Sequence, residues 1–282
     1  MTSSGTANLT IDPPVSRFGD LLRHWRQLRK LSQLELALQS KVSQRHISFL
    51  ELDRARPSRD MVIQLSESLD IPLRDRNQML IAGGFAPLYR QRDLSGEDMA
   101  AVRRALEITL KHHQPYPALV MDKDWNVVMV NDSLAPVFGA LADLDSLWQK
   151  TCGNGPRNML RLTFHPDGIA PLISNWAEVA PIMLIRMLRE AQTAGTESLS
   201  TLIKEIMQWP GIPAECPDTA WDNPPPPILP LEFEVQGHKL AIFSMISTFG
   251  TPQDITTDEL RIETFFPADD LTDQIIRSLQ NT

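Results

Sequence analysis

The closely spaced helix signals between residues 17 and 83 constrain the fold of this chain more than any other feature of the sequence. Apolar residues recur there at intervals of three and four, the period of an amphipathic helix. Ser32 is followed three residues later by Glu35, the pattern of a capping box, and Ser43 and Ser58 can cap two further helices. Because short helices are unstable alone, we expect five of them to pack into one all-α domain.

The two parts of the chain carry opposite net charge. Residues 1–92 contain 14 Lys/Arg against 9 Asp/Glu, a balance of +5, whereas residues 93–282 contain 13 against 26, a balance of −13. Together they give the net charge of −8. A basic module joined to an acidic remainder is typical of a nucleic-acid-binding domain beside a domain with another task.

Beyond the first domain the hydrophobic period changes, and several short apolar runs have the composition of strands. They lie at 118–121, 127–130, 229–236, 239–249 and 259–266. The first two flank turn residues and predict a β-hairpin. Residues 157–209 have a helical pattern, so we expect an α+β domain. Ser95 with Asp98, and Asn131 with Asp132, are expected to cap the helices that follow them.

These patterns predict a multidomain chain. We expect a flexible leader at 1–16, an α-helical domain at 17–83, a linker at 84–96 and an α+β domain at 97–282. No apolar run approaches the 18 residues of a membrane span, and the first 16 residues lack the apolar core of a secretion signal. With only two cysteines, a disulfide framework is not indicated, and we expect a cytoplasmic protein.

The sequence lacks the motifs of common metal sites and catalytic centres. The six histidines show no His-Glu-x-x-His spacing, the two cysteines no Cys-x-x-Cys spacing, and no Gly-x-Ser-x-Gly elbow occurs. We therefore expect no metal, no cofactor and no enzymatic activity. The four prolines at 224–227 are interpreted as a stiff linker rather than a partner ligand.

One group of residues between 32 and 58 stands at the fixed spacing of a known motif. It consists of Ser32-Gln33-x-Glu35-Leu36-Ala37, Val42-Ser43, Ile47-Ser48-x-Leu50-Glu51 and Arg56-Pro57-Ser58. This pattern resembles the Xre-type helix-turn-helix of phage repressors and their relatives. In such a motif the second helix enters the major groove of DNA. The alternative is an ordinary helical hairpin in a core.

The resemblance implies a set of DNA-binding residues. They are Gln33, Ser43, Gln44, Arg45, Phe49, Arg54 and Arg56. Gln33 would contact a phosphate, Arg45 suits guanine through its two-donor fork, and Gln44 suits adenine. Phe49 would touch a thymine methyl or pack beneath the helix. The two arginines after the helix would hold backbone phosphates or be merely solvated.

Three stretches of the second domain carry another resemblance. They are Pro117-Ala118-Leu119-Val120-Met121-Asp122-x-x-Trp125, Asn158-Met159-Leu160-Arg161-Leu162-x-Phe164-His165-Pro166, and Phe249-Gly250-Thr251-Pro252 through Phe265-Phe266-Pro267-Ala268-Asp269. They resemble the PAS-type ligand-binding domain of MmyB-like regulators. This implies a PAS-like cavity for an apolar, fatty-acid-like small molecule. Residues 211–228 depart from the pattern.

The candidates for the ligand site are bulky residues near these motifs, with His165 and Arg186 as possible partners for a ligand carboxylate. Each could instead belong to the core or the surface. The candidates are Trp125, Phe138, Trp148, Phe164, His165, Trp176, Met183, Arg186, Met187, Phe243 and Met245.

The sequence therefore predicts a transcription regulator that binds operator DNA through its first domain and a small apolar ligand through its second. A single reader makes few base contacts, so we expect a homodimer on a pseudo-palindrome. Two alternatives remain open. One is an enzyme or ligand-storage protein whose helix-turn-helix contacts protein, and the other is an antitoxin-like DNA-binding partner protein.

Overall fold

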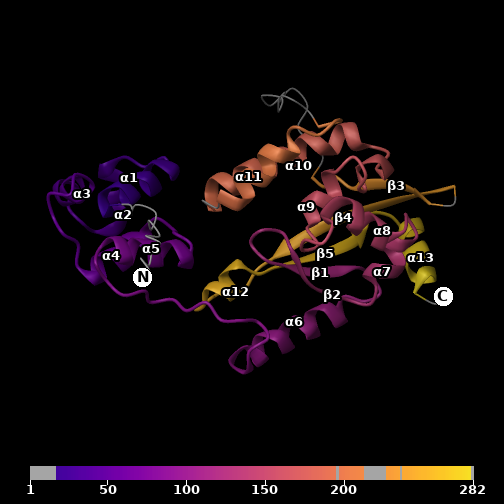
Figure 1. Ribbon diagram of the computed structural model, residues 1–282, viewed down its shortest axis with the longest axis horizontal. Helices are drawn as coiled ribbons and strands as arrows, with labels where there is room; N and C mark the ends of the chain where they lie inside the picture. Colours follow the sequence, from indigo (N-terminus) through magenta and orange to yellow (C-terminus); the bar gives the residue numbers. More distant parts are fainter. Residues whose placement is uncertain (1–16, 195–196, 213–226, 236, 281–282) are drawn as a thin grey trace, which may run out of the picture. The chain divides into compact units, whose positions relative to one another are not determined.

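The computed structural model describes residues 17–194, 197–212, 227–235 and 237–280. It divides into two compact units, one ending at Arg90 and the other beginning at Gln91 (Figure 1). The predicted leader and the first three of the four consecutive prolines lie outside the described residues. The first unit is helical and the second combines helices with a sheet, which confirms the predicted multidomain fold class.

The first unit contains five helices within residues 17–90. They are α1 (Phe18–Leu28), α2 (Gln33–Ser40), α3 (Gln44–Glu51), α4 (Arg59–Ser68) and α5 (Leu73–Ala82). The predicted capping box forms: the Glu35 amide donates to the Ser32 hydroxyl at 3.1 Å, and the Ser32 amide donates to the Glu35 carboxylate at 2.6 Å. Ser43 and Ser58 cap α3 and α4 through their hydroxyls, as expected.

The core of the first unit fixes the position of α3. Leu22 of α1, Leu36 of α2 and Ile47 and Leu50 of α3 are fully buried against one another. A Cβ atom at Gly19 would lie 2.5 Å from the Leu50 carbonyl oxygen, so α1 crosses α3 at a distance that only glycine permits. The opposite side of α3 consequently faces outward.

The second unit contains the remaining elements. They are the 3-10 helix η1 (Glu97–Met99), α6 (Ala100–His112), β1 (Ala118–Met121), β2 (Val127–Val130), α7 (Leu134–Gly139), α8 (Leu144–Cys152), α9 (Met159–Phe164), the 3-10 helix η2 (Ala170–Leu172), α10 (Trp176–Ala194), α11 (Glu197–Ile206), β3 (Leu231–Val235), β4 (His238–Ser247), α12 (Ile255–Glu259), β5 (Arg261–Pro267) and α13 (Asp270–Leu279). No helix in the described part of the chain is long and apolar enough to cross a membrane.

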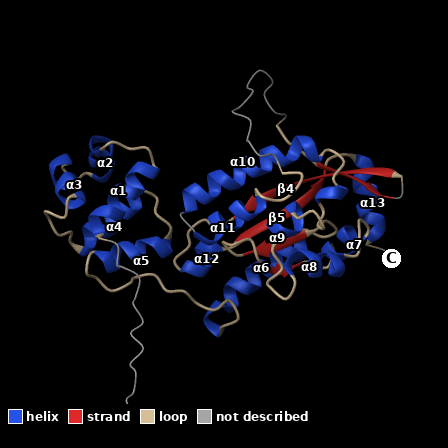
Figure 2. Cartoon of the chain, turned by 45° about the horizontal axis from the view of Figure 1, so that its top comes forward, coloured by secondary structure: helices blue, strands red, loops and turns tan. Residues whose placement is uncertain are grey.

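The described strands, red in Figure 2, form one antiparallel sheet in the order β2-β1-β5-β4-β3, so the last strand in sequence lies at its centre. Alternation along β1 assigns its two faces. Leu119 and Met121 join the main core with residues of α7 to α11, whereas Ala118 and Val120 pack with Leu106 of α6. The sheet therefore has one face covered by α6 and the other by the later helices.

Two predicted helix caps are wrong. The Ser95 hydroxyl caps no helix, because its own amide is engaged in a turn with Asp93 Oδ1 at 2.9 Å. Asn131 instead joins three segments: its Oδ1 accepts from the Ala118 amide at 3.0 Å, and its Nδ2 donates to the carbonyls of Leu110 and Tyr116. Buried polar groups need such partners, which outweighs a local cap.

Both ends of the predicted linker at 84–96 are anchored. Within the first unit, Asn77 Oδ1 accepts from the Leu88 and Tyr89 amides at 2.9 and 3.0 Å. Within the second, the Arg92 guanidinium contacts a carboxylate oxygen of Asp254, the N-cap of α12, at 2.8 Å. Only Arg90 and Gln91 lie between these two anchored stretches.

Candidate DNA-binding surface and ligand cavity

The outward side of α3 presents the residues that the motif predicts to meet bases. Ser43, Gln44 and Arg45 are exposed at its N-terminal end, while Ile47 and Leu50 are fully buried beneath. The Ser43 hydroxyl accepts from the His46 amide at 3.2 Å, so part of its hydrogen-bonding capacity serves the helix cap. An exposed helix end of this kind fits the width of the major groove.

Arg45 and Phe49 form a pair on this surface. The Arg45 guanidinium lies over the Phe49 ring, 5.3 Å from its centre, one helical turn away. Phe49 is half-buried, so its ring is neither sealed in the core nor fully exposed. Arg54 and Arg56, which follow α3, are exposed.

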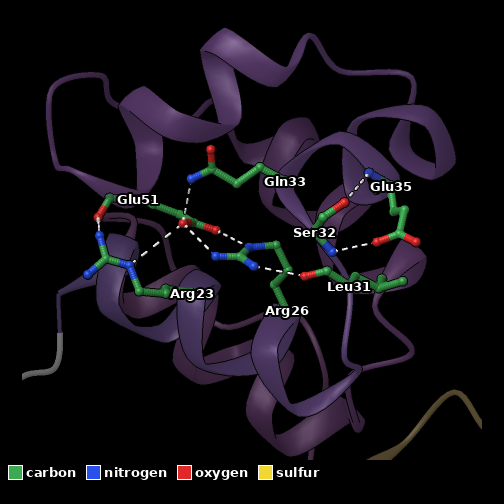
Figure 3. A network of polar contacts seen from close by, with 7 residues as sticks. All are labelled: Arg23, Arg26, Leu31, Ser32, Gln33, Glu35 and Glu51. Atoms are coloured by element: carbon green, nitrogen blue, oxygen red, sulfur yellow. Dashed lines mark hydrogen bonds and ion pairs between the residues drawn. The ribbon is translucent and has the colours of Figure 1, made fainter.

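Gln33 is fixed by a buried carboxylate beneath the surface (Figure 3). Its side-chain amide donates to Glu51 Oε2 at 2.9 Å, while Arg26 donates to both oxygens of that carboxylate at 2.6 and 3.0 Å. Arg23 lies 3.6 Å away. Burial alone raises the pKa of Glu51, but the hydrogen bonds from Arg26 and Gln33 and the nearby positive charges lower it below its usual range. The network thus ties α1, α2 and α3 together.

The second unit contains a cavity of about 480 Å³ between the sheet and helices α7, α9 and α10. Its walls come from β3, β4 and β5, from α7, α9 and α10, and from residues 227–229. Most lining side chains are apolar, among them Met159, Val179, Phe233 and Phe265. A cavity of this size and lining is typical of small-molecule sites.

Five predicted ligand residues outside the sheet line the cavity. They are Trp125, Phe138, Met183, Arg186 and Met187. Met187 is 2% exposed, whereas Arg186 is exposed beside the same cavity. The fold therefore brings two aromatic residues, two methionines and one arginine to the same cavity.

Trp125 adopts a conformation that non-glycine residues rarely take. Its φ of 67° lies in the left-handed region, which costs about 1–2 kcal/mol. The turn is held by Asp122 Oδ1, which accepts from the amides of Asp124 and Asn126, each at 2.9 Å. The Trp125 indole N–H donates to Glu190 of α10 at 3.3 Å, which fixes the ring in the cavity wall.

Four predicted ligand residues do not line this cavity. Trp148 borders a separate hollow of about 210 Å³. Phe164 and Trp176 pack edge to face with ring centres 5.4 Å apart, and the Phe164 ring is 1% exposed. His165 packs on the ring of Trp209 at 4.9 Å. These four side chains pack outside the cavity lining. The sequence did not reveal this, because the size of a side chain does not show which way it faces.

Two more predicted residues, Phe243 and Met245 of β4, also line the cavity, although alternation along the strand turns their side chains towards the opposite face of the sheet. Phe243 stacks on Phe266 with ring centres 5.4 Å apart, and Phe266 alternates with the cavity-lining Phe265. The register pairs Ser244 with Phe265, so Ser244 takes the cavity face. Because strand side chains alternate, the side chain that β4 turns to the cavity side is Ser244, between the two predicted residues.

Sequence reasoning missed the polar residues of this wall. Ser244 and Glu263 line the cavity, and the Ser244 hydroxyl donates to Glu263 Oε1 at 2.6 Å. Burial raises the pKa of the Glu263 carboxyl above its usual range, although the Ser244 hydrogen bond and the positive charge of Arg186 oppose that change. Alternation along β5, which gives Glu263 the same face as Phe265, was the signal that could have revealed it.

Comparison with protein families matches both units. A family model described as the MmyB-like transcription regulator ligand binding domain matches residues 102–279, and a helix-turn-helix model matches residues 22–75. No curated protein matches the chain.

Proposed function

This chain belongs to the family of MmyB-like transcription regulators, and we propose that a small apolar ligand in its cavity changes how it binds operator DNA. Its two domains are those of a ligand-responsive, DNA-binding regulator. We further propose that it works in the cytoplasm, beside the DNA it controls.

The cavity of about 480 Å³ is the observation that carries the ligand proposal. Small-molecule sites span roughly 300–1,000 Å³, and burying one methylene group contributes about 0.8 kcal/mol. An alkyl chain would be stabilised by the apolar walls, and fatty acids are therefore the proposed class. The strand order β2-β1-β5-β4-β3, with the cavity between the sheet and the later helices, supports a PAS-type sensor.

We further propose that α3 reads bases and that the surrounding arginines position it. Arg45 and Gln44 would contact base edges, and Phe49 a thymine methyl, with Ser43 at the leading end. Gln33, Arg54 and Arg56 would contact phosphates, which orient the protein without specifying sequence. Two copies on a pseudo-palindrome would place two such helices about 34 Å apart.

The second unit offers a route from the cavity to the linker. β5 supplies Glu263 and Phe265 to the cavity wall, and α12 immediately precedes it. The N-cap of α12, Asp254, holds Arg92 of the linker at 2.8 Å. A ligand affects DNA binding only if it binds two conformations unequally, so a change in β5 on binding would have to reach Arg92.

Calorimetry on the full-length protein tests the ligand class. Saturated fatty acids of increasing length should bind, and Met187→Ala should weaken them because it removes part of the wall. Trp176→Ala is the matched control, since this large side chain lies outside the lining and its loss should weaken binding less. Binding of polar metabolites but of no acyl chain would overturn the apolar ligand while leaving the regulator intact.

A further inference from the structure

The cavity wall contains one buried acidic side chain that its protein partners leave incompletely bonded. Glu263 lies on β5, at the centre of the sheet, and is only 8% exposed. In the described part of the chain its carboxyl accepts one hydrogen bond, from Ser244 at 2.6 Å, and it forms no ion pair. A buried charge in such surroundings is costly, which favours the neutral acid.

A count of the O–H groups of Glu263 and Ser244 shows that this pair lacks one hydrogen-bond acceptor. A neutral Glu263 and Ser244 together carry two O–H groups, and the hydrogen bond between them uses one. The second O–H needs an acceptor, and both residues line the cavity. An acceptor oxygen supplied by a ligand would satisfy it.

The charges around this pair favour an anionic oxygen. Arg186 of α10 lines the same cavity and is close enough for its charge to act on Glu263. Two further charged groups of these elements, Glu190 of α10 and Arg261 of β5, form an ion pair with each other at 2.8 Å. In the described lining, β3, β4, α7 and α9 contribute no charged side chain, so neutral Glu263 leaves Arg186 without an opposite charge.

We propose that Arg186, Ser244 and Glu263 form the head-group site of the cavity, where a ligand carboxylate binds together with one proton that Glu263 holds. This inference rests on the proposed function and adds a selective polar end to it. Arg186 supplies the opposite charge, and the protonated Glu263 donates to the carboxylate. If Glu263 is ionised before binding, it takes up one proton as the ligand enters, because two adjacent carboxylates cannot both stay charged.

Calorimetry with dodecanoate on the full-length protein measures this linkage. Titrations between pH 6 and 10, in two buffers of different ionisation enthalpy, give both the affinity and the number of protons taken up. Where Glu263 is ionised in the unliganded protein, uptake should approach one proton. The affinity should fall about tenfold per pH unit there.

Three variants separate the roles of these residues. Glu263→Gln keeps a donor but has no proton to gain, so its dodecanoate affinity should not change with pH. Arg186→Gln should lower dodecanoate affinity at least tenfold and leave 1-dodecanol within about twofold. Glu234→Gln, exposed on the opposite face of the sheet, is the control and should match the wild type.

Each result bears on one claim. Wild-type affinity that is constant from pH 6 to 10, or that changes equally in Glu263→Gln, overturns the proton-linked site. Equal binding of dodecanoate and dodecanol without pH dependence overturns the head-group site but keeps the apolar cavity. If neither probe binds at any pH, the proposed ligand class fails and the head-group site fails with it.

Discussion

Two buried glutamates, one in each unit, have opposite surroundings. Glu51 is 3% exposed and receives hydrogen bonds from Arg26 and Gln33, with Arg23 nearby. Glu263 is 8% exposed and receives one, from Ser244. A buried charge with all its partners holds elements together, whereas a buried acid with one partner beside a cavity keeps hydrogen-bonding capacity that a ligand could use. The difference separates a residue that maintains the fold from one that we propose acts in binding.

The largest expected effect is on stability in the first unit. Glu51→Ala should lower its free energy of unfolding by about 3–5 kcal/mol, because Arg26 is left buried without its partner. Urea unfolding of the full-length protein followed by circular dichroism would measure the shift. Glu67→Ala, exposed on α4, is the control and should stay within about 0.5 kcal/mol. Equal effects of both variants would contradict the structural role of Glu51.

The exposed residues above this network should affect DNA rather than stability. Arg45→Ala should weaken operator binding by about 1–3 kcal/mol and relax preference at one base position. Arg56→Ala should weaken operator and random DNA similarly, because a phosphate contact carries no sequence information. Fluorescence anisotropy on both DNAs tests this, and an equal loss on both for Arg45→Ala would remove its base-reading role.

Below about pH 4, where its carboxyl is neutral in the folded and the unfolded chain, Glu263→Gln should change stability by less than about 1 kcal/mol in either direction. The amide keeps a hydrogen bond with Ser244 and removes a group that burial already disfavours as a charge. Thermal unfolding would measure it beside Glu51→Ala. A loss as large as that of Glu51→Ala would mean that Glu263 maintains the fold, and the contrast between the two residues would disappear.

The two carboxyls should also give stability opposite dependence on pH. The folded-state pKa of Glu51 is lowered, so its contribution is present above the unfolded value of about 4.3 and is lost as pH falls through the folded pKa. That of Glu263 is raised, so its contribution is present below about 4.3 and is lost as pH rises through the folded pKa. Unfolding of each Gln variant against wild type from pH 3 to 8 should give differences of opposite slope. Slopes of the same sign would contradict the assignment.

The sequence predicted the first unit well because its signals are local. Ser32 and Glu35 form their capping box three residues apart, and Ser43 and Ser58 cap the helices they precede. The Glu51 network escaped prediction because Arg26 lies 25 residues away in the sequence. Contacts at such separation depend on how the helices cross.

The residues that line the cavity were harder to predict, because the size of a side chain does not show which way it points. Phe243 and Met245 are large, yet the register of β4 gives the cavity face to Ser244 between them. Trp148, Phe164, His165 and Trp176 are close to the family motifs in sequence but pack elsewhere. Alternation along the strand would have been the better signal, and Glu263 shows that a polar residue can lie on the cavity face.

The anchored linker limits how far a signal can travel. Tyr89 and Arg92 are each held within their own unit, and the three peptide units between them span at most about 11 Å when fully extended. Neighbouring half-sites on DNA are about 34 Å apart, so this stretch cannot lengthen enough to shift a reader by a half-site. For the proposed dimer we therefore expect ligand binding to change the orientation of each reader rather than the distance between the half-sites that it reaches.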